Sequence, residues 1–438
     1  MELHEKYRVH VEIFNQRYAK ILENAGFDGI LIHAGSVHPS FLDDQHYSFK
    51  ANPLFKSWLP LGDQPDCCLL IRPGAKPQLF FYQPSDYWYL ISGPPEEFWA
   101  DQFDLTMVYG LDEIRANLPN GHLVFFGEDE EIARHLGIQQ TNPQAILDRL
   151  HYDRAWKTEY EQDCILEANR IAARGHLTAK ETFYARGSEF EIQSRFLQRI
   201  AHREKELPYE SIVALNEHGA VAHYQLYDHT VAEHRSLIID AGAVYNGYAS
   251  DITRTYSFEE NEFAEIIRAM NLQQLALISE IKSGLSYLEL HLQMHLRTAR
   301  LLREFKFVDL EPESIVELNI SNTFFHHGLG HLLGVQVHDV GGFLQNPEGE
   351  LLPAPENHRF LRLTRKIEPN MVFTIEPGLY FVPVLLKKLK ERKEQKYLNW
   401  EKIETMIPYG GVRIEDDICM KDDGPFNITR QCFAELKE

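Results

Sequence analysis

The stretch RSLIIDAGAVYNGYASDITRTYS, residues 235–257, decides the fold of the second half of this chain. Two apolar runs flank an Asn-Gly pair at 246–247, and this dipeptide is the strongest short signal for a β-hairpin. With the pair as the loop, Gly242 lies opposite Asp251, and Asp240 lies one strand period further on the same face. The sequence therefore predicts two carboxylates as diagonal neighbours, about 7–8 Å apart, unless a bulge shifts the pairing by one residue.

A lone aspartate at a strand end commonly caps a turn or pairs with an arginine, here Arg254. Two carboxylates on one face of an apolar hairpin differ, because an unpaired buried charge is costly and like charges repel. We therefore expect a cation between Asp240 and Asp251.

The whole chain limits the possible partners. Its 438 residues, 44% of them hydrophobic, predict two or three globular domains. The net charge of −21 argues against nucleic-acid and anionic-membrane partners. The basic run 387–396 is interrupted by Glu391 and Glu394, which favours a solvated helix face. No apolar stretch approaches the length of a membrane span.

The cysteines carry no recognisable chemistry. They are odd in number and lack zinc-type spacing, as expected in a reducing cytosol. They are Cys67, Cys68, Cys164, Cys419 and Cys432. With the charged N-terminus MELHEKYRVH, they predict a cytoplasmic protein.

Residues 1 to about 150 predict an α/β domain. A helical pattern over 7–25 precedes short apolar runs, and Pro73-Gly74 marks a hairpin. The runs are GILIHAG, CCLLIRPG, QLFFYQP and HLVFFGED. No Gly-rich phosphate loop follows a run, so we do not expect a nucleotide-binding domain.

The segment 151–162 reads as a linker, and we divide the chain into domains 1–157 and 158–438. Thr158 and Glu161 form a capping box that predicts a long helix through Arg174, with Gly175 as its stop. Further patterns in the second domain predict helices near 188–205, 260–281 and 286–305, and strands near 211–216, 236–256, 371–381 and 411–420.

The second domain contains further candidate ligands. HHGLGHLLGVQVHDVGG, residues 326–342, supplies three histidines, MVFTIEPGLYF ends a strand with a glutamate, and GGVRIEDD places an arginine and a glutamate on one strand face. Each signal is weak alone, since such residues are commonly structural. The candidates are His327, His331, His338, Glu376, Arg413 and Glu415.

Carboxylate oxygens with one imidazole suit manganese, and also cobalt, zinc or iron. Four carboxylates carry a charge of −4, which two divalent cations would balance. Two ions about 3.5–4 Å apart would generate a nucleophilic bridging hydroxide and polarise a carbonyl group.

The order of the candidate ligands resembles the metal signature of the pita-bread peptidases, which include methionine aminopeptidase, aminopeptidase P and prolidase. That order is Asp240, Asp251, His331, Glu376, Glu415. Five segments are also similar to bacterial Xaa-Pro dipeptidases, the group that includes the organophosphorus acid anhydrolases: FLDDQHYSFKANPLFKSW, PYESIVALNEHGAVAHY, HGLGHLLGVQVHDVGGF, FTIEPGLYF and GGVRIEDD. The resemblance covers nearly the whole chain, whereas a methionine aminopeptidase would lack the first 150 residues.

The resemblance implies a curved mixed sheet with the metals on its concave face, and a smaller α/β domain used for dimerisation and closure. Asp251 would be bidentate, Glu415 would bridge both ions, and Asp240 would complete one ion. His331 and Glu376 would complete the other, with Glu376 also shuttling a proton.

Around these ligands, the resemblance implies further site residues. His338 would stabilise an oxyanion, and Arg362 would grip a substrate carboxylate bidentately. Arg413 would act in catalysis or orient the ligands instead. Tyr209 and His223 would shape the pocket around the proline ring, and the substrate-binding set would also include His327.

The implied function is a manganese-dependent, homodimeric Xaa-Pro dipeptidase with side activity on organophosphorus triesters and fluoridates. The alternatives are aminopeptidase P activity on longer peptides, which shares every ligand, and a non-catalytic pita-bread binding protein, which the complete ligand set disfavours. In related dipeptidases a loop resembling FLDDQHYSF crosses the dimer, so Asp44 would bind the substrate ammonium in the partner's site.

Overall fold

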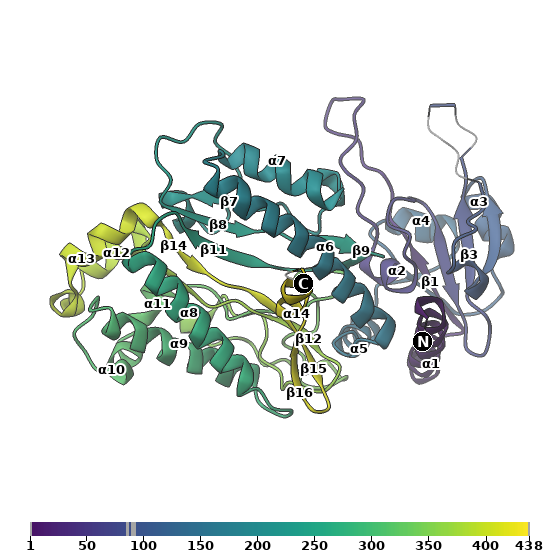
Figure 1. The fold of residues 1–438 in the computed structure, drawn as a ribbon. Coiled ribbons are helices and arrows are strands. Elements are labelled where there is room, and N and C mark those ends of the chain that lie inside the picture. Colours follow the sequence, from purple (N-terminus) through teal and green to yellow (C-terminus); the bar gives the residue numbers. More distant parts are fainter. Residues whose placement is uncertain (1, 85–86, 89–92, 437–438) are drawn as a thin grey trace. The chain divides into compact units, whose positions relative to one another are not determined.

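The computed structural model describes residues 2–84, 87–88 and 93–436, which form two compact units (Figure 1). The first unit comprises Met1–Arg154, Thr158–Asp163 and Asn346–Glu350. The second comprises Ala155–Lys157, Cys164–Gln345 and Leu351–Glu438.

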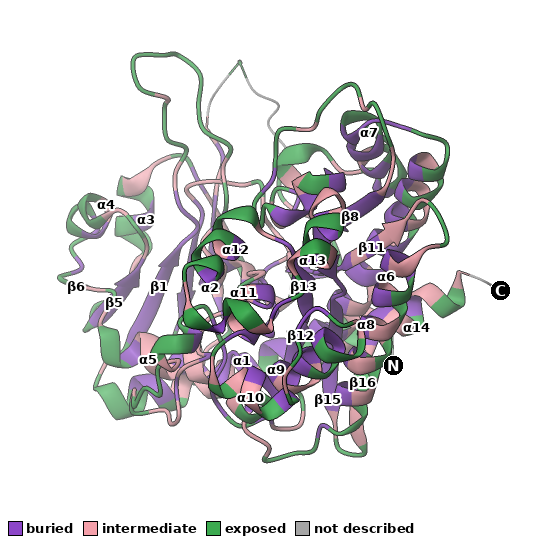
Figure 2. Cartoon of the chain, turned by 90° about the vertical axis from the view of Figure 1, so that its left-hand side faces the viewer, coloured by how far each residue is buried: buried purple, intermediate pink, exposed green. Residues whose placement is uncertain are grey.

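The first unit is built on a six-stranded mixed sheet in the order β4-β3-β2-β1-β5-β6. All five residues of β1 are buried, as Figure 2 shows in purple. The elements are α1 (Leu3–Ala25), β1 (Gly29–His33), α2 (Pro53–Trp58), β2 (Cys68–Ile71), β3 (Gln78–Tyr82), β4 (Asp104–Val108), α3 (Leu111–Asn117), β5 (Leu123–Phe126), α4 (Glu130–His135), β6 (Gln140–Thr141) and α5 (Gln144–Asp153).

The four predicted apolar runs of this unit form β1, β2, β3 and β5. The hairpin predicted at Pro73-Gly74 joins β2 to β3, which pair antiparallel with Leu69 opposite Leu79. Gly74 has a φ of 72°, a left-handed conformation that glycine adopts without a Cβ penalty. The strand β4 was not predicted, because DLTMV is partly exposed and lacks a long apolar run.

The second unit carries small sheets in the orders β11-β8-β7 and β12-β15-β16, with the pairs β9-β10 and β13-β14. Its strands are β7 (Ile212–Leu215), β8 (Ser236–Asp240), β9 (Val244–Tyr245), β10 (Tyr248–Ala249), β11 (Thr253–Ser257), β12 (Val372–Ile375), β13 (Gly378–Tyr380), β14 (Gly411–Arg413), β15 (Asp416–Lys421) and β16 (Gly424–Asn427). Its helices are α6 (Glu159–Tyr184, which begins in the first unit), α7 (Glu189–Ile200), α8 (Glu262–Ser279), α9 (Tyr287–Glu304), α10 (Pro312–Glu317), α11 (Ser321–Phe324), α12 (Pro383–Lys390), α13 (Trp400–Met406) and α14 (Ile428–Glu435).

The hairpin register predicted from Asn246-Gly247 is confirmed. Val244 pairs with Ala249 beside the turn, and Asp240 pairs with Thr253 at the far end. The same register holds between these points, because the amide of Ala241 donates to the carbonyl of Ile252. No bulge intervenes, so Gly242 lies opposite Asp251 as expected.

The two faces of this hairpin have different neighbours. Leu237, Ile239 and Ala241 pack with side chains of α6 and α7 in one apolar cluster. Asp240 and Asp251 lie on the opposite face, because side chains alternate along a strand. Figure 1 shows α6 and α7 on one side of β7, β8 and β11, with α8 and α9 on the other.

The prediction that the helix after the linker stops at Gly175 was wrong, although its capping box is present. The Thr158 amide donates to Glu161 (2.8 Å), and α6 then continues to Tyr184. A Cβ at Gly175 would lie 2.6 Å from side-chain atoms of Ile200 and Phe196. Gly175 therefore allows α7 to pack closely against α6.

All five cysteines are buried, and none of them forms a disulfide bond. Among the described residues, no helix combines the length and apolar character needed to cross a membrane.

Candidate metal centre

The five predicted metal ligands come from the ends of strands and the loops beside them in the second unit. Asp240 ends β8, and Asp251 lies two residues before β11. Glu376 follows β12 directly, and Glu415 lies between β14 and β15. His331 is held beside β12, because its carbonyl accepts from the Thr374 amide and its own amide donates to the Thr374 hydroxyl.

The ligand atoms of Asp251, His331 and Glu415 all lie within 4.8 Å of one another. His331 Nε2 lies 3.4 Å from Asp251 Oδ2 and 3.6 Å from Glu376 Oε1. Three of these side chains are deeply buried, whereas the Glu376 side chain is 18% exposed. The carboxylates and the imidazole therefore converge on one buried point with an opening at Glu376.

Tyr209 joins the two aspartates of the hairpin. Its hydroxyl oxygen lies 2.8 Å from Asp240 Oδ1 and 2.6 Å from Asp251 Oδ1. Burial and the neighbouring carboxylates raise the pKa of Tyr209 well above its ordinary value, so the hydroxyl keeps its proton. We expected Tyr209 to shape the substrate pocket, and the structure places its hydroxyl against two of the predicted ligands.

Arg413 also contacts a ligand. Its Nη2 lies 2.8 Å from Asp240 Oδ2, its Nε donates to the Thr253 hydroxyl, and its Nη1 donates to Tyr380. The Thr253 hydroxyl in turn donates to Glu415 Oε2 at 2.7 Å. Arg413 thus fixes two of the predicted metal ligands, Asp240 directly and Glu415 through Thr253.

The pKa values of the carboxyl groups are strongly perturbed. Burial raises the pKa of Glu376 to about 7, and burial with charge repulsion from Asp251 raises that of Glu415 well above its ordinary range. Burial also raises the pKa of Asp240, partly offset by Arg413. Burial opposes ionisation of Asp251 too, but its contacts with His331 outweigh this and lower the pKa.

The buried carboxylates fit divalent cations. The arginine suggested as a structural partner of the aspartates, Arg254, instead pairs with Asp416 at 2.8 Å. Arg413 supplies one positive charge to Asp240, but Glu376 and Glu415 are crowded by the other carboxylates, and their pKa values are raised. Such an arrangement is costly without a cation, and oxygen ligands with one imidazole suit manganese and similar ions.

His338 and His327 border the centre. The rings of His338 and His331 meet edge to face at 4.4 Å, and His338 itself is exposed. Partial desolvation of the ring by its neighbours, together with repulsion from His331 and Arg362, lowers the pKa of His338 to about 4. His327 Nδ1 lies 3.6 Å from Glu376, and its Nε2 bonds the Tyr380 hydroxyl.

The remaining predicted residues are all exposed. His223 and Arg362 are exposed, and both act electrostatically on His338 to lower its pKa. Asp44 is exposed in the first unit, where its carboxylate accepts a bond from Gln45 at 3.3 Å.

Three supporting residues were not predicted. Thr253 and Tyr380 link Arg413 to other site residues, and buried Asp417 accepts a hydrogen bond of 3.0 Å from the Asp251 amide. The alternation of side chains along β11 places Thr253 on the Asp251 face, and this signal could have identified it. Asp417 was not identified, although it lies only two residues after the predicted ligand Glu415.

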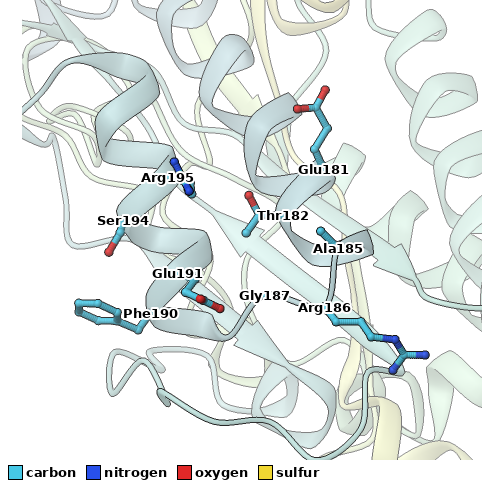
Figure 3. Close-up of a pocket in the computed structure, with 9 residues that line it drawn as sticks. All are labelled: Glu181, Thr182, Ala185, Arg186, Gly187, Phe190, Glu191, Ser194 and Arg195. Atoms are coloured by element: carbon cyan, nitrogen blue, oxygen red, sulfur yellow. The ribbon is translucent and has the colours of Figure 1, made fainter.

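A separate hollow lies between α6 and α7 (Figure 3). Two of the charged side chains that line it already make stabilising contacts within the fold. Glu191 caps α7 through the Ser188 amide, and Arg186 covers the Phe258 ring at 4.5 Å. None of the predicted site residues lines this hollow.

Sequence comparison matches both parts of the chain to known families. Residues 5–152 match the Xaa-Pro dipeptidase N-terminal domain, and residues 163–422 match metallopeptidase family M24. The chain is 45% identical to an Xaa-Pro dipeptidase of Shewanella baltica, with 98% of each chain covered. It is 46% identical to one of Pseudoalteromonas translucida, with 97% of each covered.

Solved structures share the fold at lower identity. Proline aminopeptidase P II from Yersinia pestis aligns with a TM-score of 0.71 and 22% identity, covering 99% of this chain and 97% of that one. The low-pH form of aminopeptidase P from E. coli aligns with a TM-score of 0.74 and 22% identity, covering 98% and 99%. The mixed helix-and-sheet architecture of a smaller N-terminal domain followed by a pita-bread domain is thereby confirmed.

Proposed function

Because the chain belongs to metallopeptidase family M24 and, within it, to the Xaa-Pro dipeptidase family, we propose that it hydrolyses dipeptides whose second residue is proline. The observation that carries the proposal is the convergence of Asp251, His331 and Glu415, with ligand atoms within 4.8 Å of one another. Relatives that match nearly the whole chain at 45% and 46% identity are named Xaa-Pro dipeptidases.

The centre would hold two divalent ions, with manganese as the expected metal. Asp240, Asp251, Glu376 and Glu415 supply four carboxylates, and His331 supplies the imidazole. When bound, the ions would lower the pKa of a water molecule and polarise the carbonyl group of the scissile bond.

The chain's own residues would perform the proton transfers. Glu376 has the most exposed carboxylate of the four, with 18% of its side chain accessible against 13% for Asp240. It is therefore best placed to take a proton from the attacking water and deliver it to the departing proline nitrogen. Exposed His338 would donate a hydrogen bond to the carbonyl oxygen as negative charge develops there.

Substrate recognition would come from the exposed side of the centre. The guanidinium of Arg362 suits bidentate binding of the substrate carboxylate. His223 and His327 would border the proline ring. The Xaa-Pro bond is a tertiary amide without an N–H, and a centre that acts on the carbonyl group requires no such donor.

We assign Arg413 and Tyr209 positioning roles. The hydrogen bonds described for the Arg413 side chain all go to Asp240, Thr253 or Tyr380. The Tyr209 hydroxyl contacts the carboxylates of Asp240 and Asp251. These contacts orient carboxylates that must bind metal ions.

The first domain, residues 1–157, would serve dimerisation and closure of the site. Asp44 would bind the substrate ammonium in the partner subunit's site. In a dipeptide the free ammonium lies close to the cleaved bond. A carboxylate fixed beside it would bind the ammonium of a dipeptide and obstruct a longer chain.

A side activity on organophosphorus triesters and fluoridates would use the same centre. A phosphorus atom under attack resembles the tetrahedral intermediate of amide hydrolysis, so the same nucleophile and cations serve both. Turnover of diisopropyl fluorophosphate should disappear together with dipeptidase activity in Asp251→Asn. Survival of that turnover would place it at another site.

The products of two substrates test the proposal. Chromatography after incubation with Gly-Pro and with Gly-Pro-Ala should show release of proline from the dipeptide and an intact tripeptide. Cleavage of the tripeptide at a comparable kcat/KM would indicate aminopeptidase P activity. No cleavage of either by the manganese-loaded protein would indicate a binding protein.

A further inference from the structure

A second group of histidines lies in the second unit, apart from the carboxylate centre. His291 and His295 are four residues apart on the buried face of α9, and His358 lies in the short helical turn Glu356–His358. The exposed fractions of these residues are 1%, 1% and 9%. One ring nitrogen from each lies within 4.8 Å of the other two.

The three rings surround a common point. Each pair of ring centroids is separated by 4.6 Å. His291 Nε2 lies 3.0 Å from His358 Nδ1. Two imidazole nitrogens bound to one tetrahedral zinc, each at about 2.0–2.1 Å, lie about 3.3 Å apart, so only a small adjustment would admit the ion.

The hydrogen bonds leave this cluster incompletely satisfied. His295 Nδ1 forms a hydrogen bond of 3.0 Å with the Ser321 hydroxyl, whereas His295 Nε2 is buried without a hydrogen-bond partner among the described residues. Buried polar atoms without partners are uncommon and require an explanation. The hydrogen bond between the Ser321 hydroxyl and Nδ1 of His295 also orients the other ring nitrogen, Nε2, as such bonds do in many metal-binding histidines.

We propose that His291, His295 and His358 form an additional metal site for zinc or a similar borderline transition metal. The site offers three neutral imidazoles, which suit zinc, cobalt, nickel and copper better than manganese, and leaves a fourth position for water. Burial lowers the pKa of all three histidines, to about 3 for His295, which keeps them in the neutral form that binds metals.

The ion would connect α9 to the segment that follows His358. That segment packs tightly against the glycine-rich stretch 326–342, which carries His331. A Cβ at Gly328 would lie only 2.8 Å from the Phe360 carbonyl oxygen. Arg362, the proposed carboxylate-binding residue, lies four residues after His358. The site would therefore stabilise the segment that presents Arg362.

Zinc stoichiometry tests this proposal without any measurement of activity. Purified, chelated protein would be dialysed against zinc and analysed by inductively coupled plasma mass spectrometry. We expect about one zinc per chain fewer in His358→Asn and in His295→Gln than in the wild type. The matched control is His176→Gln, since His176 is also fully buried in the second unit with one unpartnered nitrogen, and it should lose no zinc.

A wild-type measurement covers the case in which the variants fail to fold. Protein first saturated with manganese and then dialysed against zinc should hold about one divalent ion per chain more than protein saturated with manganese alone, whether or not zinc also replaces manganese at the carboxylate centre. Zinc should also raise its Tm. Equal zinc contents in the wild type and both histidine variants, or no extra ion in the manganese-loaded wild type, would overturn the proposal. Failure of the dipeptidase proposal would change the metal content of every variant equally, so the two outcomes are distinguishable.

Discussion

The guanidinium of Arg413 lies 2.8 Å from the carboxylate of Asp240, and the same side chain reaches Glu415 through the Thr253 hydroxyl. A lysine could replace the charge but not this set of bonds, because its ammonium is a single point. We expect Arg413→Lys to weaken manganese binding by about 10–100-fold.

The kinetics of this variant separate positioning from substrate binding. At saturating manganese, KM for Gly-Pro should stay close to that of the wild type, whereas isothermal titration should show the loss of metal affinity. Arg170→Lys is the control, since Arg170 pairs with Glu435 at the surface. A raised KM with unchanged metal affinity would assign Arg413 to the substrate instead.

Metal binding should depend on pH. In the metal-free protein, burial raises the pKa of Glu376 to about 7 and that of Glu415 well above its ordinary value. Metal ions bind the ionised carboxylates, so they must displace protons, and affinity should rise between about pH 5 and pH 8. Calorimetry in two buffers of different ionisation enthalpy would measure the released protons. Binding that releases none would contradict these shifts.

The same shifts predict a stability effect in the absence of metal. A carboxyl group with a raised pKa in the folded state costs stability as the pH rises above its unfolded pKa, about 4.3 for glutamate. Glu415→Gln removes this cost. The metal-free variant should therefore gain Tm relative to the metal-free wild type as the pH rises from about 5 to about 8. A difference that is constant with pH would exclude a buried, ionising Glu415.

Complementation tests the role of Asp44 across the dimer. Asp44→Ala and Asp251→Asn should each be inactive on Gly-Pro, and mixing them under exchanging conditions should restore activity. If Asp44 acts between subunits, the mixed dimer has one complete site. Its metal ligands come from the Asp44→Ala subunit, and its Asp44 comes from the Asp251→Asn subunit. No recovery would place the contact within one subunit. Asp44→Ala should also lose more on Gly-Pro than on an N-acetylated analogue, because only Gly-Pro has an ammonium group.

Substitution of Gly175 tests the packing of α6 against α7. An added Cβ would lie 2.6 Å from Phe196 and Ile200, and overpacking of a core costs about 1–3 kcal/mol. The better helix propensity of alanine offsets about 1 kcal/mol of this. Urea unfolding of Gly175→Ala should therefore show a net loss of stability, whereas Gly110→Ala, which meets no atom within 4 Å, should change little.

The hairpin register could be predicted because it depends on a local signal, the Asn-Gly turn, and on alternation along the strands. The end of α6 could not, because Gly175 acts through contact with Phe196 in another helix. The same limit applies to the histidine cluster, since His358 lies far along the chain from His291 and only the fold brings them together.

Chelation and reloading test the dinuclear centre most directly. The protein would be stripped of metal, examined by native mass spectrometry, reloaded with manganese and assayed for proline release from Gly-Pro at each stage. We predict no activity in the stripped protein and full activity once two ions are bound per chain, with neither binding nor activity recovered in Asp251→Asn. Full activity in the metal-free protein would contradict the account.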